Sequence, residues 1–264
     1  MELPSTVNDS QRYNAYIEKY YYNDTNFIEI AIPTNGRPVG MFISGGVDSA
    51  LVCYLLAKTV KKYNTGTKIY PITTEFMARP FNIRHSWSVL RKIEELLDIT
   101  FEQHLVFPMP NHSINITDED KKVIMSDNLN RYFKHYNLKS IFNGLTANPP
   151  VEEMPDNLYG HRQVERDDMD LVLRKLEQHG MQYPLLFTHK RQLAYLYEKF
   201  DLLDSLFPLT RSCEAESEES LQHTKTCYEV RSPGTECWWC REREYGFKDY
   251  RPKDFINTSG KVND

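Results

Sequence analysis

Changes in the spacing of apolar residues divide the chain into alternating strand and helix segments. Residues 39–43 are uncharged and of strand length, and from Asp48 onward the apolar positions recur at helical spacing. Further strands are predicted at residues 68–76, 101–107 and 140–145, with helices at residues 82–98, from residue 117 and at residues 188–200. This alternation predicts an α/β fold in which a parallel sheet carries helices on both faces.

Two regions depart from that alternation. Residues 1–32 are rich in tyrosine, and we expect a short helix followed by an alternating strand at the edge of the sheet. Clustered tyrosines can stack on nucleobases, but packing inside an amphipathic segment is the more ordinary role. Residues 151–180 are crowded with acidic side chains and lack a strand signal, which indicates a loop and helical insertion over the ligand crevice, with a lid as one role. A solvated face explains the acidic side chains, with binding of a metal or a basic substrate as the alternative.

These patterns divide the chain into four parts. Residues 1–38 form an N-terminal extension, and residues 39–210 form the main domain, with the acidic insertion at 151–180. Residues 211–250 form a cysteine-containing segment and residues 251–264 a tail.

Composition and charge exclude some functions. The 264 residues are 40% hydrophobic, which suffices for a substantial core, and the net charge of −5 gives no strong signal for nucleic-acid binding. The first ten residues lack the pattern of a signal peptide, and no apolar run is long enough to cross a bilayer. We therefore expect a cytoplasmic protein without a membrane partner.

The loop after the first predicted strand of the main domain has the chemistry of an anion site. It consists of Ser44, Gly45, Gly46, Val47, Asp48 and Ser49. The glycine pair lets the backbone approach a ligand closely, and the first N–H groups of the next helix favour a negative charge. The serine hydroxyls can bind phosphate oxygens, and Asp48 can hold Mg²⁺ or cap the helix.

Ligands of a parallel sheet bind beyond the carboxyl ends of the strands. Three residues lie at the ends of neighbouring predicted strands and should converge there: Ser44, Glu75 and Thr146. If the anion at the loop is the phosphate of a nucleotide, we assign Thr73, Gly144 and Thr146 to the binding site of that nucleotide. Lys190 lies in the first turn of a helix, where its charge opposes the helix dipole unless an anion is bound, so it is a candidate phosphate ligand; a lysine that points to water is the alternative.

Four of the five cysteines lie close together near the C-terminal end of the chain. They are Cys213, Cys227, Cys237 and Cys240, the last two in a C-x-x-C pattern. Four thiolates match the tetrahedral coordination of structural Zn²⁺, with reduced cysteines or a redox pair as alternatives. The fifth, Cys53, lies on the apolar side of a helix and is expected in the core.

The loop resembles the signature S-G-G-x-D-S of the PP-loop ATP pyrophosphatases, which it matches at every fixed position. That resemblance implies an adenine nucleotide alpha hydrolase-like fold and cleavage of ATP between its α- and β-phosphates. ATP and Mg²⁺ are the implied cofactors, beside the structural Zn²⁺ expected at the cysteines, and Ser44, Asp48, Ser49 and Lys190 have the implied catalytic roles.

Several later segments are similar to 7-cyano-7-deazaguanine synthases. They are Pro184-Leu185-Leu186 with Lys190, Thr210-Arg211-Ser212-Cys213, and a C-x-x-C followed by Arg241 and Gly246-Phe247. Arg84 and His85 also match a family segment, and we assign them to the substrate together with His161 and Arg162, whose imidazole and guanidinium suit an anion. The family's P-G-R-N and Y-P-D-C-R elements have no clear counterpart.

The resemblance implies a ligase that adenylates a small-molecule carboxylate, a 7-deazapurine, and transfers ammonia to it. Two alternatives stay open: another PP-loop enzyme, such as a tRNA-modifying or amide-forming ligase, and a nucleotide-binding interaction protein without turnover. A homodimer is a further expectation.

Overall fold

The computed structural model describes residues 5–7, 12–76, 81–109, 118–154, 163–178, 180–213 and 237–250. Its centre is a five-stranded parallel sheet in the order β5-β4-β3-β6-β7. The strands are β3 (Val39–Phe42), β4 (Ile69–Phe76), β5 (Leu105–Met109), β6 (Ile141–Phe142) and β7 (Met181–Gln182). The predicted α/β fold with a parallel sheet is therefore confirmed.

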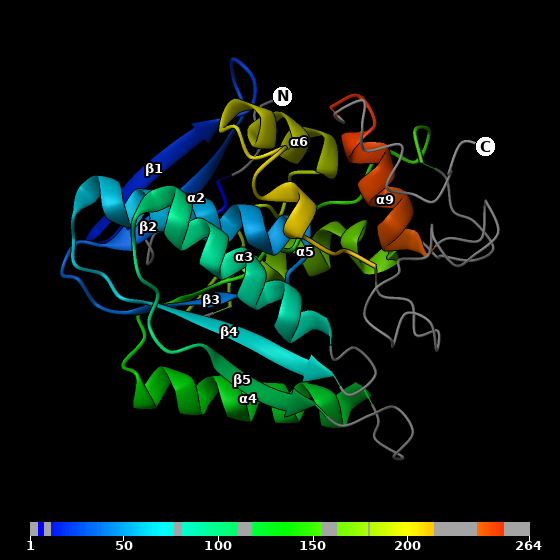
Figure 1. The fold of residues 1–264 in the computed structure, drawn as a ribbon. Helices are drawn as coiled ribbons and strands as arrows, with labels where there is room; N and C mark the ends of the chain where they lie inside the picture. Colours follow the sequence, from blue (N-terminus) through cyan, green and yellow to red (C-terminus); the bar gives the residue numbers. More distant parts are fainter. Residues whose placement is uncertain are drawn as a thin grey trace.

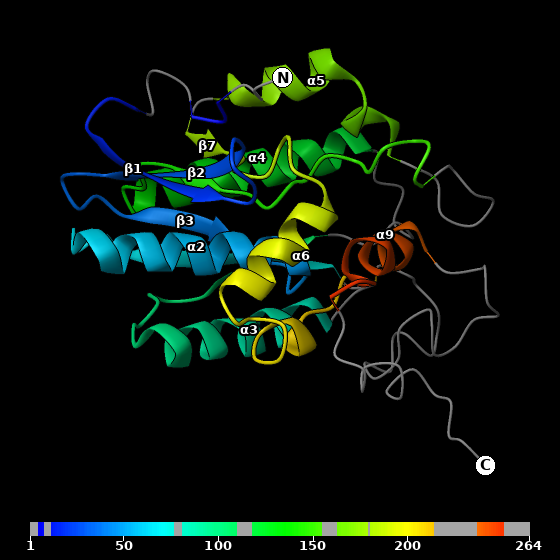
Figure 2. The same cartoon turned by 90° about the horizontal axis from the view of Figure 1, so that it is seen from above.

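Helices cover both faces of this sheet, as Figures 1 and 2 show. Helix α4 (Asp118–His135) lies on one face, and α2 (Val47–Tyr63) and α3 (Phe81–Leu97) lie on the other. The remaining helices are η1 (Val164–Arg166), α5 (Met169–Leu176), α6 (Lys190–Lys199), η2 (Phe207–Leu209) and α9 (Trp238–Phe247). In Figure 1, α9 lies beyond the carboxyl ends of the strands, at the side where ligands of such sheets bind.

The main core forms where α2 packs between the sheet and its neighbouring helices. Eleven residues of α2 are buried, including Cys53, so that side chain is in the core as expected. Burial of this apolar surface is the principal source of stability for the fold. None of the helices in the described ranges is long and apolar enough to cross a membrane.

The tyrosine-rich segment near residue 20 is a strand, so the prediction of a short helix there is wrong. Strand β1 (Ala15–Tyr21) pairs antiparallel with β2 (Phe27–Pro33) in a separate two-stranded sheet, whereas an edge strand of the main sheet was expected. Tyrosine favours strands, and pairing with the isoleucine-rich β2 decided the outcome. The hydroxyl of Tyr20 lies 3.1 Å from the Leu55 carbonyl oxygen and 2.8 Å from Thr59 Oγ1, so this tyrosine packs on α2.

Other boundaries differ from the prediction by a few residues. Strand β5 begins four residues later than the expected strand, and β6 keeps only two residues of the expected six. The apolar character of these segments reflects burial as well as pairing; Phe101, for example, is buried outside the ladder. Helix α6 begins after His189, one residue beyond the threonine expected to cap it, and the cap expected at Thr117 lies outside the described residues.

Three half-buried histidines make the stability of the fold sensitive to acid. Burial lowers the pKa of His85, His104 and His189 below the ordinary value of about 6.5. Below that value the unfolded chain binds protons that the folded chain does not. The free energy of unfolding should therefore fall as the pH drops from about 6.5 to the folded-state pKa, by at most about 1.4 kcal/mol per pH unit for each histidine.

Urea unfolding at pH 7.5 and 5.5 tests this prediction. His104 is informative because its Nε2 lies 2.7 Å from Thr73 Oγ1, whose hydroxyl donates to the Ile43 carbonyl oxygen at 2.6 Å. His104→Gln should reduce the loss of stability between the two pH values, whereas the exposed His135→Gln should leave it unchanged. Equal losses in both variants would contradict the assignment.

Candidate active site

The loop between β3 and α2 is held in shape by its own serines. Ser49 Oγ lies 3.1 Å from Ser44 Oγ and 3.2 Å from both the Ser44 backbone nitrogen and the Gly46 carbonyl oxygen. Gly45 has a φ of +82°, and a Cβ there would lie 2.6 Å from His85 Cβ and 2.8 Å from the Ser86 nitrogen. A glycine is therefore required at this position, both by backbone conformation and by the close approach of α3.

Glycine at residue 144 lets β6 end directly against the start of α2. A Cβ at Gly144 would lie 2.7 Å from the Ser49 nitrogen and 2.9 Å from the Asp48 carbonyl carbon. The segment after β6 can approach the loop this closely only because residue 144 has no side chain. Binding of the nucleotide by Gly144 stays a prediction.

Lys190 points into the same site from α6, although it is 142 residues away from Asp48 in sequence. Its Nζ lies 2.7 Å and 2.5 Å from the two carboxylate oxygens of Asp48, and its side chain is 1% exposed. The alternative of a lysine that points to water is therefore excluded. Close packing holds its stem, because a Cβ at Gly246 would lie 2.5 Å from Lys190 Cβ.

Two charged residues that the sequence did not single out complete a buried ionic cluster. Glu242, on α9, lies 3.3 Å from Lys190 Nζ and 2.5 Å from Arg166 Nη2. Arg166 also donates to the carbonyl oxygens of Thr146 and Ala147, at 2.8 Å and 2.6 Å. Burial opposes ionisation of Glu242, but the charges of Lys190 and Arg166 outweigh it, so the pKa of this carboxyl lies below its usual range.

Asp48, Arg166 and Glu242 border a cleft of about 340 Å³ at the carboxyl end of the sheet, and Lys190 lies behind Asp48. Its polar and charged lining consists of Ser44, Asp48, Ser49, Thr74, Asn82, Asn143, Thr146, Gln163, Arg166 and Glu242, and its apolar lining includes Phe42, Ile72, Met125, Leu145 and Trp239. An open cleft with apolar residues on its walls and charged residues at one end suits a nucleotide, which has an apolar base and charged phosphates.

Some predicted site residues lie elsewhere. Thr73 is buried and bonded to Ile43 and His104, and the adjacent Thr74 lines the cleft in its place. Glu75 is not among the lining residues. Arg84 is exposed, and His85 lies beneath the loop with Nδ1 3.1 Å from the Leu209 carbonyl oxygen. His161 and Arg162 lie outside the described residues.

Two acidic residues of the insertion, Glu153 and Asp168, have structural partners. Asp168 caps α5 by accepting from the backbone nitrogens of Asp170 and Leu171, and Glu153 binds Arg191 at 2.8 Å and the Tyr245 hydroxyl at 2.7 Å. The carboxylates that reach the cleft instead come from α2 and α9. Two described residues of the insertion line the cleft, Gln163 and, at the end of η1, Arg166.

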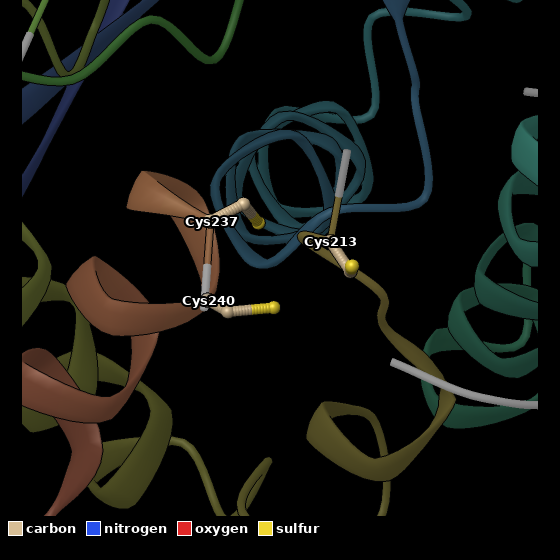
Figure 3. A group of neighbouring side chains, drawn as sticks. All are labelled: Cys213, Cys237 and Cys240. Carbon is tan, nitrogen blue, oxygen red and sulfur yellow. The ribbon is translucent and has the colours of Figure 1, made fainter. Parts of the chain in front are cut away.

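Three of the four predicted metal ligands meet beside the loop. The sulfur atoms of Cys213, Cys237 and Cys240 lie within 4.8 Å of one another and are buried. Figure 3 shows Cys237 and Cys240 at the start of α9 and Cys213 in the segment after η2, with their sulfur atoms turned toward the same space. Sulfurs that share a tetrahedral zinc lie about 3.8 Å apart, so this arrangement fits a thiolate-bound metal. Cys227 lies outside the described residues.

The segment that carries Cys213 also contacts the loop. The Arg211 backbone nitrogen donates to the Gly45 carbonyl oxygen at 2.7 Å, and Ser212 Oγ lies 3.5 Å from the Val47 nitrogen. From α9, Arg243 donates to the carbonyl oxygen and hydroxyl of Thr210, both at 2.9 Å. The thiolate cluster therefore joins the loop to the helix that supplies Glu242.

Loss of one thiolate should release that connection. We expect Cys213→Ser to bind less than about half an equivalent of zinc and to lose about 4 kcal/mol of stability, the scale of a lost metal site. For a chain of this size that loss corresponds to a fall in Tm of roughly 8–16 °C. Metal analysis after purification without chelator, with thermal unfolding, measures both quantities.

Cys53→Ala is the matched control, because Cys53 is buried in α2 away from the cluster. It should retain its zinc. Wild-type protein with less than about half an equivalent of zinc would show that the thiols hold no structural zinc.

Comparisons with known proteins match the part of the chain that contains the loop, but they do not identify a substrate. The asparagine synthase family model matches residues 34–82, which include β3, the loop, α2 and β4. Among solved structures, the U34-tRNA thiolase NcsA from Methanococcus maripaludis with its [4Fe-4S] cluster aligns at 16% identity, over 87% of this chain and 74% of that chain, with a TM-score of 0.44. A likeness this weak carries no information about substrate or metal. The curated proteins contain no match.

The family match covers the loop whose geometry is described above. Together they support an ATP-using enzyme of the PP-loop type.

Proposed function

We propose that this chain is an ATP-dependent ligase that releases AMP and pyrophosphate while it joins ammonia to a carboxylate. The observation that carries the proposal is Lys190, a buried cation held by Asp48 at the mouth of the loop. A buried ammonium next to a helix N-terminus suits a polyphosphate, because the ammonium and the backbone N–H groups both favour negative charge.

The residues of the cleft divide the work of the first step. The substrate carboxylate attacks the α-phosphorus of ATP, the bond to the β-phosphate breaks, and pyrophosphate leaves. Ser44, Ser49 and the start of α2 are placed to bind phosphate oxygens, and Lys190 is placed to balance the charge that develops on the leaving group. Asp48 would hold Mg²⁺, which supplies further charge neutralisation at the phosphates.

In the second step ammonia displaces AMP from the acyl adenylate, which gives an amide and releases one proton. A second ATP can activate the amide oxygen in the same way with release of pyrophosphate, and loss of AMP and of the two protons on the amide nitrogen then leaves a nitrile. This sequence converts 7-carboxy-7-deazaguanine to 7-cyano-7-deazaguanine, and we propose that reaction or a close variant of it.

The lining of the cleft supports a planar, polar substrate. Trp239 offers an aromatic surface, and Asn82, Asn143 and Gln163 offer amide groups that can both donate and accept hydrogen bonds. A heteroaromatic carboxylate with several ring nitrogens matches both features. Thiolation of tRNA is less well supported, because no cysteine lines the cleft among the residues that the structure describes.

Incubation with ATP, Mg²⁺, ammonium and 7-carboxy-7-deazaguanine, followed by mass spectrometry, tests the proposal. The expected products are the amide and the nitrile, with AMP and pyrophosphate. Formation of AMP without amide or nitrile would reject the assigned substrate while leaving the ATP chemistry in place.

A further inference from the structure

Glu242 has a position that the proposed reaction does not explain by itself. It lies two residues after Cys240, is fully buried, and contacts two cations that come from separate parts of the chain. A buried carboxylate is costly unless charges of opposite sign and hydrogen bonds compensate it. Here the compensation comes from Lys190, on α6, and Arg166, on η1.

The cluster contains two carboxylates and two cations, so its charges balance. The two carboxylates differ in access: the Asp48 side chain is 24% exposed and faces the cleft, whereas Glu242 is 0% exposed. If Asp48 binds Mg²⁺ with the nucleotide, its hold on Lys190 weakens. The Lys190 ammonium would then have Glu242 as its remaining carboxylate partner within the cluster.

Arg166 fixes the position of the Glu242 carboxylate independently of Lys190. The guanidinium is bound to Glu242 and to the Thr146 and Ala147 carbonyl oxygens, and Nη2 also lies 3.0 Å from Thr146 Oγ1. Glu242 is therefore connected, through Arg166, to the segment after β6 that lines the cleft. Its second oxygen remains 3.3 Å from Lys190 Nζ.

We propose that Glu242 is a positioning residue that holds the Lys190 ammonium in place for the phosphates while Asp48 engages Mg²⁺. The proposal deepens the function proposed above and rests on it for the identity of the nucleotide. It assigns a role in the ATP site to α9, the helix that begins with the C-x-x-C thiols. When the nucleotide binds, Lys190 then exchanges its contact with Asp48 for a contact with the phosphates and keeps its contact with Glu242.

The test is a double-mutant cycle on binding of Mg²⁺ with α,β-methylene-ATP, an analogue that cannot release pyrophosphate, measured by titration calorimetry. Glu242→Gln should weaken binding about 10-fold or more, since a hydrogen bond to a charged group is lost. Lys190→Met should weaken it at least as much. The double variant should bind no more weakly than Lys190→Met, because Glu242 acts through Lys190.

Glu242→Asp separates charge from packing. Aspartate keeps the carboxylate on a side chain that is shorter by one methylene. It should recover most of the affinity for the ATP analogue that Glu242→Gln loses. If Glu242→Gln does not fold, Arg166→Met with Glu242→Gln removes the buried pair as a unit. This double variant should still bind about 10-fold more weakly than Arg166→Met alone.

Wild-type affinity in Glu242→Gln, or losses that multiply in the double variant with Lys190→Met, would overturn the proposal. Because binding of the analogue needs no turnover, the result is separate from that of the ligase assay. A wild-type protein that forms no amide but shows the expected cycle would refute the proposed function and leave the role of Glu242 intact.

Discussion

Replacement of Lys190 by methionine is expected to reduce formation of AMP from ATP by about 100- to 1,000-fold. Methionine keeps the apolar stem that packs against Gly246, so the substitution removes mainly the charge. The expected size is that of removing one preorganised group that stabilises the transition state. Steady-state release of pyrophosphate, measured with saturating carboxylate and ammonium, gives the change in kcat.

Arg191→Met is the matched control for this prediction. Arg191 is the next residue of α6 and pairs with Glu153 at the surface, where ion pairs contribute little. Its kcat should stay within about twofold of wild type. A Lys190→Met protein that is folded and retains more than about a fifth of the wild-type kcat would show that Lys190 has no part in the chemistry.

Replacement of Gly246 by alanine is expected to disturb both the packing of α9 on α6 and the turnover of the site. The added Cβ would lie 2.5 Å from Lys190 Cβ and 2.8 Å from the Lys190 carbonyl carbon, so α6 and α9 must separate. Overpacking of this kind costs about 1–3 kcal/mol, which corresponds to a fall in Tm of roughly 2–12 °C. A displacement near 1 Å of Lys190 relative to Glu242 should also lower kcat about 100-fold.

Gly66→Ala provides the comparison. Gly66 has a φ of +68° but no atom within 4 Å of an added Cβ, so alanine there introduces backbone strain of about 1 kcal/mol without a clash. It should lower Tm slightly and leave kcat unchanged. If Gly246→Ala had the same modest effect on both quantities, the packing of α9 on α6 would not control the site.

The main sheet was predictable because its strands and helices alternate in apolar spacing. The loop was predictable for a different reason, since its glycines and serines are needed locally, as the contact between Gly45 and α3 shows. Tyrosine clustering near residue 20 misled the prediction, because side-chain spacing in such a short segment fits a helix or a strand. Pairing with β2, a contact that local pattern does not encode, decided between them.

The ionic cluster was only partly predictable. Lys190 could be singled out by its unfavourable place in the first turn of a helix. Glu242 and Arg166 gave no such signal: each lies in a run of charged residues that reads as a solvated surface, at residues 165–168 and 241–244. Their burial follows from the docking of α9 on α6, which depends on Gly246 and on the thiols at the start of α9. The one signal in the sequence was Gly246, a small residue about one helical turn after Glu242 that allows another helix to pack closely on that face of α9.

Transfer of oxygen from the substrate tests the central claim most directly. With a carboxylate labelled in both oxygens with ¹⁸O, attack on the α-phosphorus places one labelled oxygen in AMP. Mass spectrometry should find AMP heavier by 2 Da, with unlabelled pyrophosphate, at one AMP for each amide and two for each nitrile formed. Release of ADP and phosphate, or of AMP without the label, would contradict it.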